Sequence, residues 1–275
     1  MRIVPSRPRQ GGLDMITTML IAGPPGCGKT SWILNRLQSH PGPCGYLRLP
    51  GFPEEDLPQA HDGGIDLTYL QYLCPGLLDL SQSDLTVQSQ QGPPLALIEL
   101  PQFQPPHQVG LEGLDPRLIP YLDALHLIPD QYLHFGRDSE LPVQDTLDFH
   151  NLETWSHNLT GSVWDPDSLN SFWFELVNGA YGDVYRAKAL MNRPDGGAFF
   201  FNWMVSRSGS QFLPLQTMAP PDGRPERLSH LVLQGRGLNP AGIETTISDC
   251  LLSDAVLELQ QSPLRPSQHP APLPI

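Results

Sequence analysis

Residues 15–31 read MITTMLIAGPPGCGKTS, and this stretch decides the fold of the first half of the chain. Residues 15–22 are apolar and partly β-branched, which is typical of a buried strand. A turn rich in glycine and proline follows, and Trp32, Ile33 and Leu37 then recur at helical spacing. The stretch therefore predicts a strand, a tight loop and a helix in succession.

The loop itself, GPPGCGKT, fits the G-x-x-x-x-G-K-[ST] pattern of a phosphate-binding loop. Glycines let successive backbone amides point at a phosphate, and the helix N-terminus adds partial positive charge. Lys29 is predicted to reach the β- and γ-phosphate oxygens, and the Thr30 hydroxyl is predicted to bind Mg²⁺. The predicted cofactor is GTP or ATP with Mg²⁺, and its predicted binding residues are Gly23, Pro24, Pro25, Gly26, Cys27, Gly28, Lys29, Thr30 and Ser31. Cys27 either has a reactive thiol or only fills space within the loop.

An acidic partner for the metal is expected at the end of a neighbouring strand. Residues 95–100, LALIEL, are apolar enough for a buried strand, and Glu99 lies near its end. Phosphate loops use such a carboxylate to hold the metal or to orient water. Glu99 and Lys29 are therefore the predicted catalytic residues, and the alternative for Glu99 is a solvated strand end.

Strands and helices alternate through the rest of the first half. Further strands are predicted near residues 45–49 and 124–128, and helices over residues 66–73 and from Pro116, which Asp115 would cap. This alternation predicts a parallel sheet with helical crossovers, which is the α/β class.

The pattern changes after about residue 145. Strands are predicted over residues 152–162, 182–191, 196–206 and 228–235, and helices begin at Asp165-Pro166 and Asn239-Pro240. Closely spaced strands with two helices predict a small α+β domain with an antiparallel sheet. Its tryptophans, Trp155, Trp164, Trp173 and Trp203, are expected to form the core.

Two domains are expected from these two patterns. Residues 15–150 are predicted to form a nucleotide-binding domain, and residues 151–262 the α+β domain. A single core rarely grows beyond roughly 250 residues, which favours two domains in a chain of 275. Residues 1–14 and 263–275 are rich in Pro, Arg or Gly and are expected to be disordered.

Composition argues against several functions and compartments. The chain has 16 Lys+Arg and 29 Asp+Glu, a net charge of −13, which is unsuited to binding nucleic acid. No stretch approaches the roughly 20 apolar residues of a membrane span, and the N-terminal residues lack the apolar region of a signal peptide. The four cysteines form no CxxC, which favours a reducing compartment. We expect a cytoplasmic protein that binds neither nucleic acid nor membrane.

Four segments together resemble the CobW-type P-loop GTPases, a metallochaperone-like family, and their C-terminal domain. These segments are GPPGCGKT, PPLALIELPQFQPP, VYRAKALM and LVLQGRGLNPAGIETTISDCLL, and the resemblance spans most of residues 15–253. It implies a P-loop domain with a parallel sheet, followed by a small ferredoxin-like α+β domain. It also implies GTP binding, slow hydrolysis of the nucleotide, and a client metalloprotein as partner.

The chain departs from the family at three places. Where the family carries a CxCC metal-binding motif, LCPGLLDL keeps only Cys74. The family's Glu-x-x-Gly is Glu99-Leu100-Pro101-Gln102, and no Asn/Thr-Lys-x-Asp guanine-reading motif follows it. We therefore predict weak discrimination between GTP and ATP, with Asp130 and Asp138 as loose candidates for a base contact, and no stoichiometric zinc or cobalt.

These departures leave two main functions open, with a small-molecule kinase as a weaker third. The first is a nucleoside triphosphatase related to metallochaperone GTPases. The alternative is a non-catalytic nucleotide-sensing or scaffolding protein, because the glycine after Glu99 and the base-reading motif are missing.

In the second domain, Arg186 and Lys188 alternate along one strand and share one of its faces. That face either contacts the nucleotide domain or a partner, or is solvated. Gly235 and Gly237 either form a second phosphate site or make the turn before the last helix. His107 has no neighbouring Cys or carboxylate and is not expected to bind a metal.

Overall fold

The structure is a computed structural model of the 275-residue chain. It describes residues 2–3, 16–23, 26–49, 64–85, 92–101, 118–136, 138, 153–205, 211–215 and 219–265. The chain divides into two compact units, Met1–Leu152 (unit 1) and Glu153–Ile275 (unit 2). No helix in these ranges is long and apolar enough to cross a membrane.

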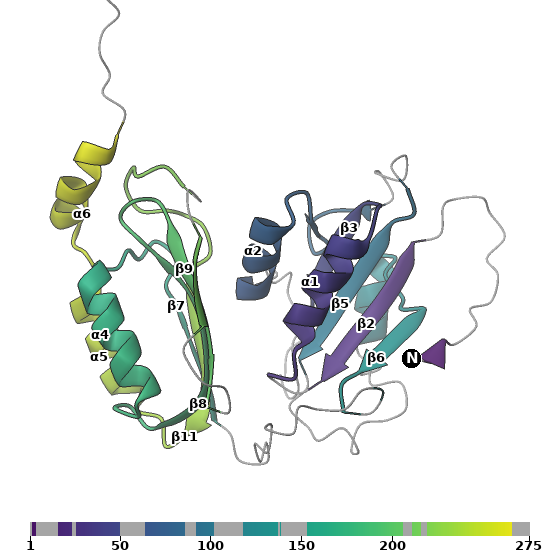
Figure 1. Cartoon of the computed structure of the whole chain (residues 1–275), viewed down its shortest axis with the longest axis horizontal. Helices are drawn as coiled ribbons and strands as arrows, with labels where there is room; N and C mark the ends of the chain where they lie inside the picture. Colours follow the sequence, from purple (N-terminus) through teal and green to yellow (C-terminus); the bar gives the residue numbers. More distant parts are fainter. Residues whose placement is uncertain are drawn as a thin grey trace, which may run out of the picture. The chain divides into compact units, whose positions relative to one another are not determined.

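Unit 1 is built around a mostly parallel sheet (Figure 1), which in the described residues has six strands in the order β1-β6-β2-β5-β3-β4. Neighbouring strands from β6 to β4 run parallel, and β1 pairs with β6 in the antiparallel sense. The parallel strands, numbered along the chain, therefore follow the order 3-2-4-1-5. The strands are β1 (Arg2–Ile3), β2 (Thr17–Gly23), β3 (Cys44–Arg48), β4 (Leu78–Asp79), β5 (Leu95–Pro101) and β6 (Gln131–His134), and the helices are α1 (Lys29–Ser39), α2 (Gly64–Leu73) and α3 (Ile119–Ala124).

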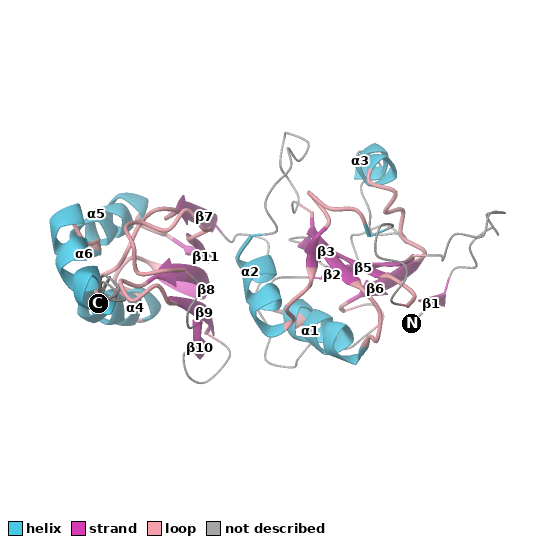
Figure 2. Cartoon of the chain, turned by 90° about the horizontal axis from the view of Figure 1, so that it is seen from above, coloured by secondary structure: helices cyan, strands magenta, loops and turns pink. Residues whose placement is uncertain are grey.

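Helices cover both faces of this sheet. Alternate residues of each strand point to opposite sides, and here both sides carry apolar residues that must be buried. In β2, Met19 and Ile21 belong to the apolar cluster that includes residues of α1 and α2. Leu20 and Ala22 belong to a second cluster with Leu122 of α3. Figure 2 shows α1 and α2 on one side of the strands and α3 on the other. The α/β class expected for residues 15–150 is thus what the structure has.

One predicted strand is wrong. Residues 124–128 were expected to form a strand because they are largely apolar, but Ala124 ends α3 and the chain turns at His126, where φ is 57°. Leu127 packs into the cluster around α3 instead, and β6 begins only at Gln131. Because β1 is in the sheet, two residues of the N-terminal segment expected to be disordered are ordered. The predicted cap, Asp115-Pro116, lies outside the described residues.

Unit 2 contains an antiparallel sheet with helices packed on one face (Figure 1), and in the described residues its strand order is β10-β9-β8-β11-β7. This confirms the α+β class. The unit's order of strands and helices is β-α-β-β-β-β-α-α, so a ferredoxin-like β-α-β-β-α-β pattern describes only its first four elements. The strands are β7 (Glu153–Asn158), β8 (Asp183–Asn192), β9 (Ala198–Met204), β10 (Gln211–Leu215) and β11 (His230–Arg236), and the helices are α4 (Pro166–Val177), α5 (Pro240–Cys250), α6 (Asp254–Gln261) and the 3₁₀ helix η5 (Ser262–Leu264).

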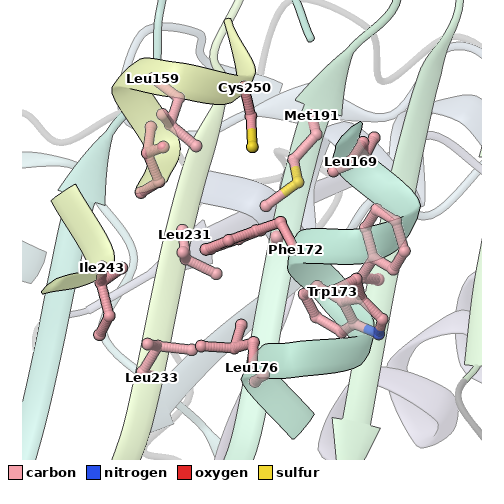
Figure 3. Packing of buried hydrophobic residues seen from close by; sticks show 14 of the residues in the cluster. Leu159, Leu169, Phe172, Trp173, Leu176, Met191, Leu231, Leu233, Ile243 and Cys250 are labelled. Carbon is pink, nitrogen blue, oxygen red and sulfur yellow. The ribbon is translucent and has the colours of Figure 1, made fainter. Parts of the chain in front are cut away.

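The core of unit 2 lies between this sheet and the helices α4 and α5. Figure 3 shows Phe172 and Leu176 of α4 directed towards Leu231 and Leu233 of β11. The ring of Trp173 also stacks on Phe201 of β9, with centroids 4.1 Å apart. Trp164 is fully buried in the same core, and Trp155 and Trp203 are partly buried against it. The tryptophans therefore serve packing, as the sequence predicts.

The start of α4 generates a first prediction. Asp165 caps the helix, and its carboxylate accepts hydrogen bonds from the amide and hydroxyl of Ser168, which lower the pKa of Asp165. Asp165→Ala should lower the free energy of unfolding by about 1 kcal/mol at pH 7. The cap is stabilising above the carboxyl's ordinary pKa of 3.8 and is lost as the pH falls through the lowered value, so wild type and variant should converge in acid.

Urea unfolding followed by tryptophan fluorescence at several pH values measures this difference. Asp167→Ala, at an exposed site in the same turn, is the matched control and should cost only a few tenths of a kcal/mol. An equal loss in both variants would refute the cap.

Candidate functional site

The described residues of the loop between β2 and α1 include glycines in conformations or spaces that other residues do not fit. Gly26 and Gly28 adopt positive φ values of 82° and 98°, which other residues rarely adopt. A Cβ on Gly23 would lie 2.7 Å from Cβ of Phe135 and 2.9 Å from Sγ of Cys27, so only glycine fits there. Cys27 is 4% exposed and packs into the core beside α1, which makes it a space-filling residue. Pro24 and Pro25, also predicted to bind the cofactor, lie outside the described residues.

Lys29 and Glu99, the two predicted catalytic residues, are brought together at the carboxyl edge of the sheet. The Lys29 ammonium donates to the carbonyl of Gly23 at 2.8 Å and lies 3.7 Å from Oε1 of Glu99. Both side chains are 5% exposed. Glu99 is thus a buried partner of the loop lysine, and the solvated strand end is wrong.

Tyr46 on β3 holds the other oxygen of Glu99. Its hydroxyl donates to Oε2 at 2.7 Å, and the side chain is fully buried. Burial first, and the charge of Glu99 second, raise the pKa of Tyr46 well above its usual value of 10. The hydroxyl therefore remains protonated and fixes the Glu99 carboxylate in one orientation.

A second ion pair lies beside the first. The Thr30 hydroxyl, at the start of α1, donates to Oδ1 of Asp66 at 3.0 Å. The guanidinium of Arg48 lies 2.6 Å from Oδ2 of the same carboxylate, which is 3% exposed. Arg48 ends β3 in register with Glu99 on β5, so both ion pairs occupy one edge of the sheet. We refer to Lys29, Arg48, Asp66 and Glu99 as the charge cluster.

The N-terminus of α1 follows the glycine loop directly, with Gly28 as its N-cap. Among the described residues no side chain caps this helix, and its first turn carries no acidic residue. Unpaired amides at a helix N-terminus attract anions. Thr30 and Ser31 lie in this turn, and Ser31 is exposed. The loop, the helix start and Lys29 can therefore bind a phosphate group together.

The oxygen atoms beside the loop suit Mg²⁺. This ion takes one or two protein carboxylates together with substrate phosphates and water. The Thr30 hydroxyl and the carboxylates of Asp66 and Glu99 provide oxygen ligands of that type, so the residues fit the ion.

In the described part of the chain no three His, Cys, Asp or Glu side chains come together as a metal site. Burial, and then the proximity of Cys74, raise the pKa of the Cys44 thiol to about 11, which disfavours the thiolate that binds metal.

The two loose candidates for a base contact, Asp130 and Asp138, lie at opposite edges of the sheet. The amide of Asp130 donates to the carbonyl of Thr18, at the start of β2, so Asp130 lies at the edge opposite the loop and is wrong as a base contact. Asp138 lies shortly after β6. The amide of Phe135, the residue that follows β6, donates to the carbonyl of Ala22 beside the loop. Its Oδ2 accepts the amide of His134 at 2.9 Å and helps to hold this turn.

The candidates in unit 2 have structural partners. Lys188 is 4% exposed and lies over the Phe200 ring, so it is not on a solvated face. Arg186 donates to Gln234. The amides of Gly237 and Leu238 are bound by the carboxylate of Glu153 at 3.1 Å, so an internal carboxylate fills the place of a second phosphate.

Three residues of the site were missed in the sequence: Tyr46, Arg48 and Asp66. The signal available for Asp66 is a charge on the apolar face of a helix, between Ile65 and Leu67, because such a residue requires a buried partner. For Arg48 and Tyr46 the sequence carries no comparable signal. Their position beside Glu99 follows only from the register of β3 and β5.

The strand order 3-2-4-1-5, with a glycine-rich loop after the first parallel strand, is that of a P-loop-like α/β fold. No protein-family model matches the chain, and no curated protein matches its sequence. Among solved structures, the chain is similar to the Zn(II)-bound YjiA GTPase from E. coli, with a TM-score of 0.31 and 10% identity over 86% of this chain and 98% of that chain. A Zn(II)-bound triple mutant of YjiA GTPase gives a TM-score of 0.30 and 12% identity over 86% and 99%. TM-scores this low carry no argument about the fold. The fold is therefore assigned from the strand order and the glycine-rich loop of the chain itself.

The bond between Tyr46 and Glu99 generates a second prediction. Tyr46→Phe removes the donor to a buried carboxylate and should lower the free energy of unfolding by about 1.5–3 kcal/mol at pH 7. Wild type should also lose stability as the pH rises above 10, because unfolded tyrosine ionises there and Tyr46 does not. The Phe variant should lack this contribution.

Urea unfolding at pH 7 and 10.5 tests both points. Tyr72→Phe is the control, because Tyr72 is 38% exposed on α2. A similar loss in the control, or none in Tyr46→Phe, would contradict the bond.

Proposed function

We propose that unit 1 binds a nucleoside triphosphate, GTP or ATP, with Mg²⁺ and hydrolyses it slowly, as a relative of the CobW-type GTPases. The observation that carries this proposal is the position of the Lys29 ammonium. It lies inside a glycine loop at the edge of the sheet, between an uncapped helix start and the buried carboxylate of Glu99. A buried cation bonded to a loop carbonyl is well placed to bind phosphate oxygens instead.

Each residue has a distinct role in this proposal. The loop amides and Lys29 bind the phosphates, and Thr30 with Asp66 holds the metal. When bound, Mg²⁺ neutralises charge on the transferred phosphoryl group. Glu99 orients the attacking water, and Tyr46 keeps that carboxylate in place.

The second candidate function is non-catalytic nucleotide sensing or scaffolding. Its support is that both oxygens of Glu99 already have partners, Lys29 and Tyr46, so the carboxylate has little freedom to accept a proton. A client metalloprotein, which the family resemblance implies, has the weakest support, because Cys74 is the residue that remains of the metal motif.

The first test removes the loop cation. Lys29→Ala should weaken triphosphate binding at least tenfold, because a charged hydrogen-bond partner of the phosphates is lost. Titration calorimetry with GTP and ATP, with and without Mg²⁺, measures the affinities. Arg36→Ala, on the last turn of the same helix, removes one positive charge away from the loop and should bind like wild type. Equal affinity in wild type and Lys29→Ala would show that the loop does not bind phosphate.

The second test separates hydrolysis from sensing. Glu99→Gln should leave triphosphate affinity within about threefold, since Gln still accepts from Tyr46, but should slow phosphate release at least roughly tenfold. Asp123→Asn, at an exposed site on α3, removes one negative charge from the same unit and is the control. If wild type releases no phosphate with Mg²⁺, the sensing function is favoured, and if Glu99→Gln turns over normally, Glu99 is not catalytic.

A further inference from the structure

Arg48 differs from the other members of the charge cluster in its exposure. Its side chain is 32% exposed, whereas those of Lys29, Asp66 and Glu99 are 3–5% exposed. Its guanidinium also lies near the start of α2, since a Cβ on Gly64 would be 3.9 Å from it. A long side chain at the rim of a site can turn from one partner to another, whereas the buried members are held by their surroundings.

The charges of the cluster balance without a ligand, because two cations face two carboxylates. A Mg²⁺-bound triphosphate still carries net negative charge and needs further cations nearby. Asp66 links Arg48 to the proposed metal residue, because one of its oxygens accepts from Thr30 and the other pairs with Arg48. If the Asp66 carboxylate turns towards a metal ion, its attraction for the Arg48 guanidinium weakens.

We propose that Arg48 binds the terminal phosphate of a nucleoside triphosphate, and that Asp66 holds Arg48 beside the loop until that phosphate arrives. This inference rests on the proposed function of unit 1. A guanidinium offers forked donors that match phosphate oxygens, and an arginine supplied in cis can stabilise a terminal phosphoryl group.

A purely structural role for Arg48 makes a different prediction. If the arginine only neutralises the buried Asp66, its removal acts on the whole site, and diphosphate and triphosphate binding weaken alike. A contact with the terminal phosphate weakens triphosphate binding selectively. The ratio of triphosphate to diphosphate affinity therefore separates the two roles.

The experiment is titration calorimetry of the full chain with GTP, GDP, ATP and ADP, with and without Mg²⁺. Arg48→Ala should weaken triphosphate binding roughly tenfold or more and change diphosphate binding by less than about threefold. Arg48→Lys should recover part of the loss, because it restores the charge without the fork. Arg36→Ala, with the same charge change, should alter neither affinity by more than about threefold.

Asp66→Asn and Asp66→Asn/Arg48→Ala extend the test if Arg48→Ala leaves Asp66 unneutralised and fails to fold. Thermal unfolding of each variant monitors this. The loss on removing Arg48 should remain selective for triphosphates in the Asp66→Asn background. Equal loss of both ligands, or no loss, would overturn the assignment while wild-type binding and its dependence on Lys29 left the proposed function intact. Wild type that binds no nucleotide would instead refute the proposed function and this inference together.

Discussion

Burying the ammonium of Lys29 costs free energy unless the group is hydrogen-bonded and neutralised. Gly23 supplies a carbonyl and Glu99 a carboxylate, and Tyr46 then satisfies the second oxygen of Glu99. Because these groups come from three neighbouring strands, the register of β2, β5 and β3 is tied to one charge. The site and the sheet edge are in this sense one structure.

The second ion pair follows the same logic on a helix. Asp66 is buried among apolar residues of α2, and Thr30 and Arg48 both bind its carboxylate. These bonds connect α2 to the start of α1 and to the end of β3. A ligand that competes for Asp66 or Thr30 therefore acts on two helices and a strand at once, which links occupancy of the loop to the packing of unit 1.

The parts that could be predicted from sequence are those determined by neighbouring residues. The strand over residues 17–23, the helix over residues 29–39 and the cap at Asp165 are local, and the structure has them. Residues 124–128 were misassigned because an apolar run does not distinguish a buried strand from a turn packed under a helix, and here Leu127 takes the second role. Tyr46, Arg48 and Asp66 could not be placed, because their partners lie on other strands and helices far away in sequence.

In unit 2 the turn at Gly237 shows why a glycine-rich motif after a strand is ambiguous. Its amides do bind an anionic group, as they would a phosphate, but the group is the carboxylate of Glu153 from the same unit. Sequence alone predicts the type of group bound at such a turn and not its source. The loop at Gly23 differs because a buried lysine accompanies its amides.

The chain contains two lysines, Lys29 and Lys188, and both are buried. Neither ε-amine is therefore exposed on the folded protein. Acetylation, ubiquitin transfer and amine-directed cross-linking all require an accessible ε-amine. Such chemistry should therefore leave both lysines unmodified while the chain is folded.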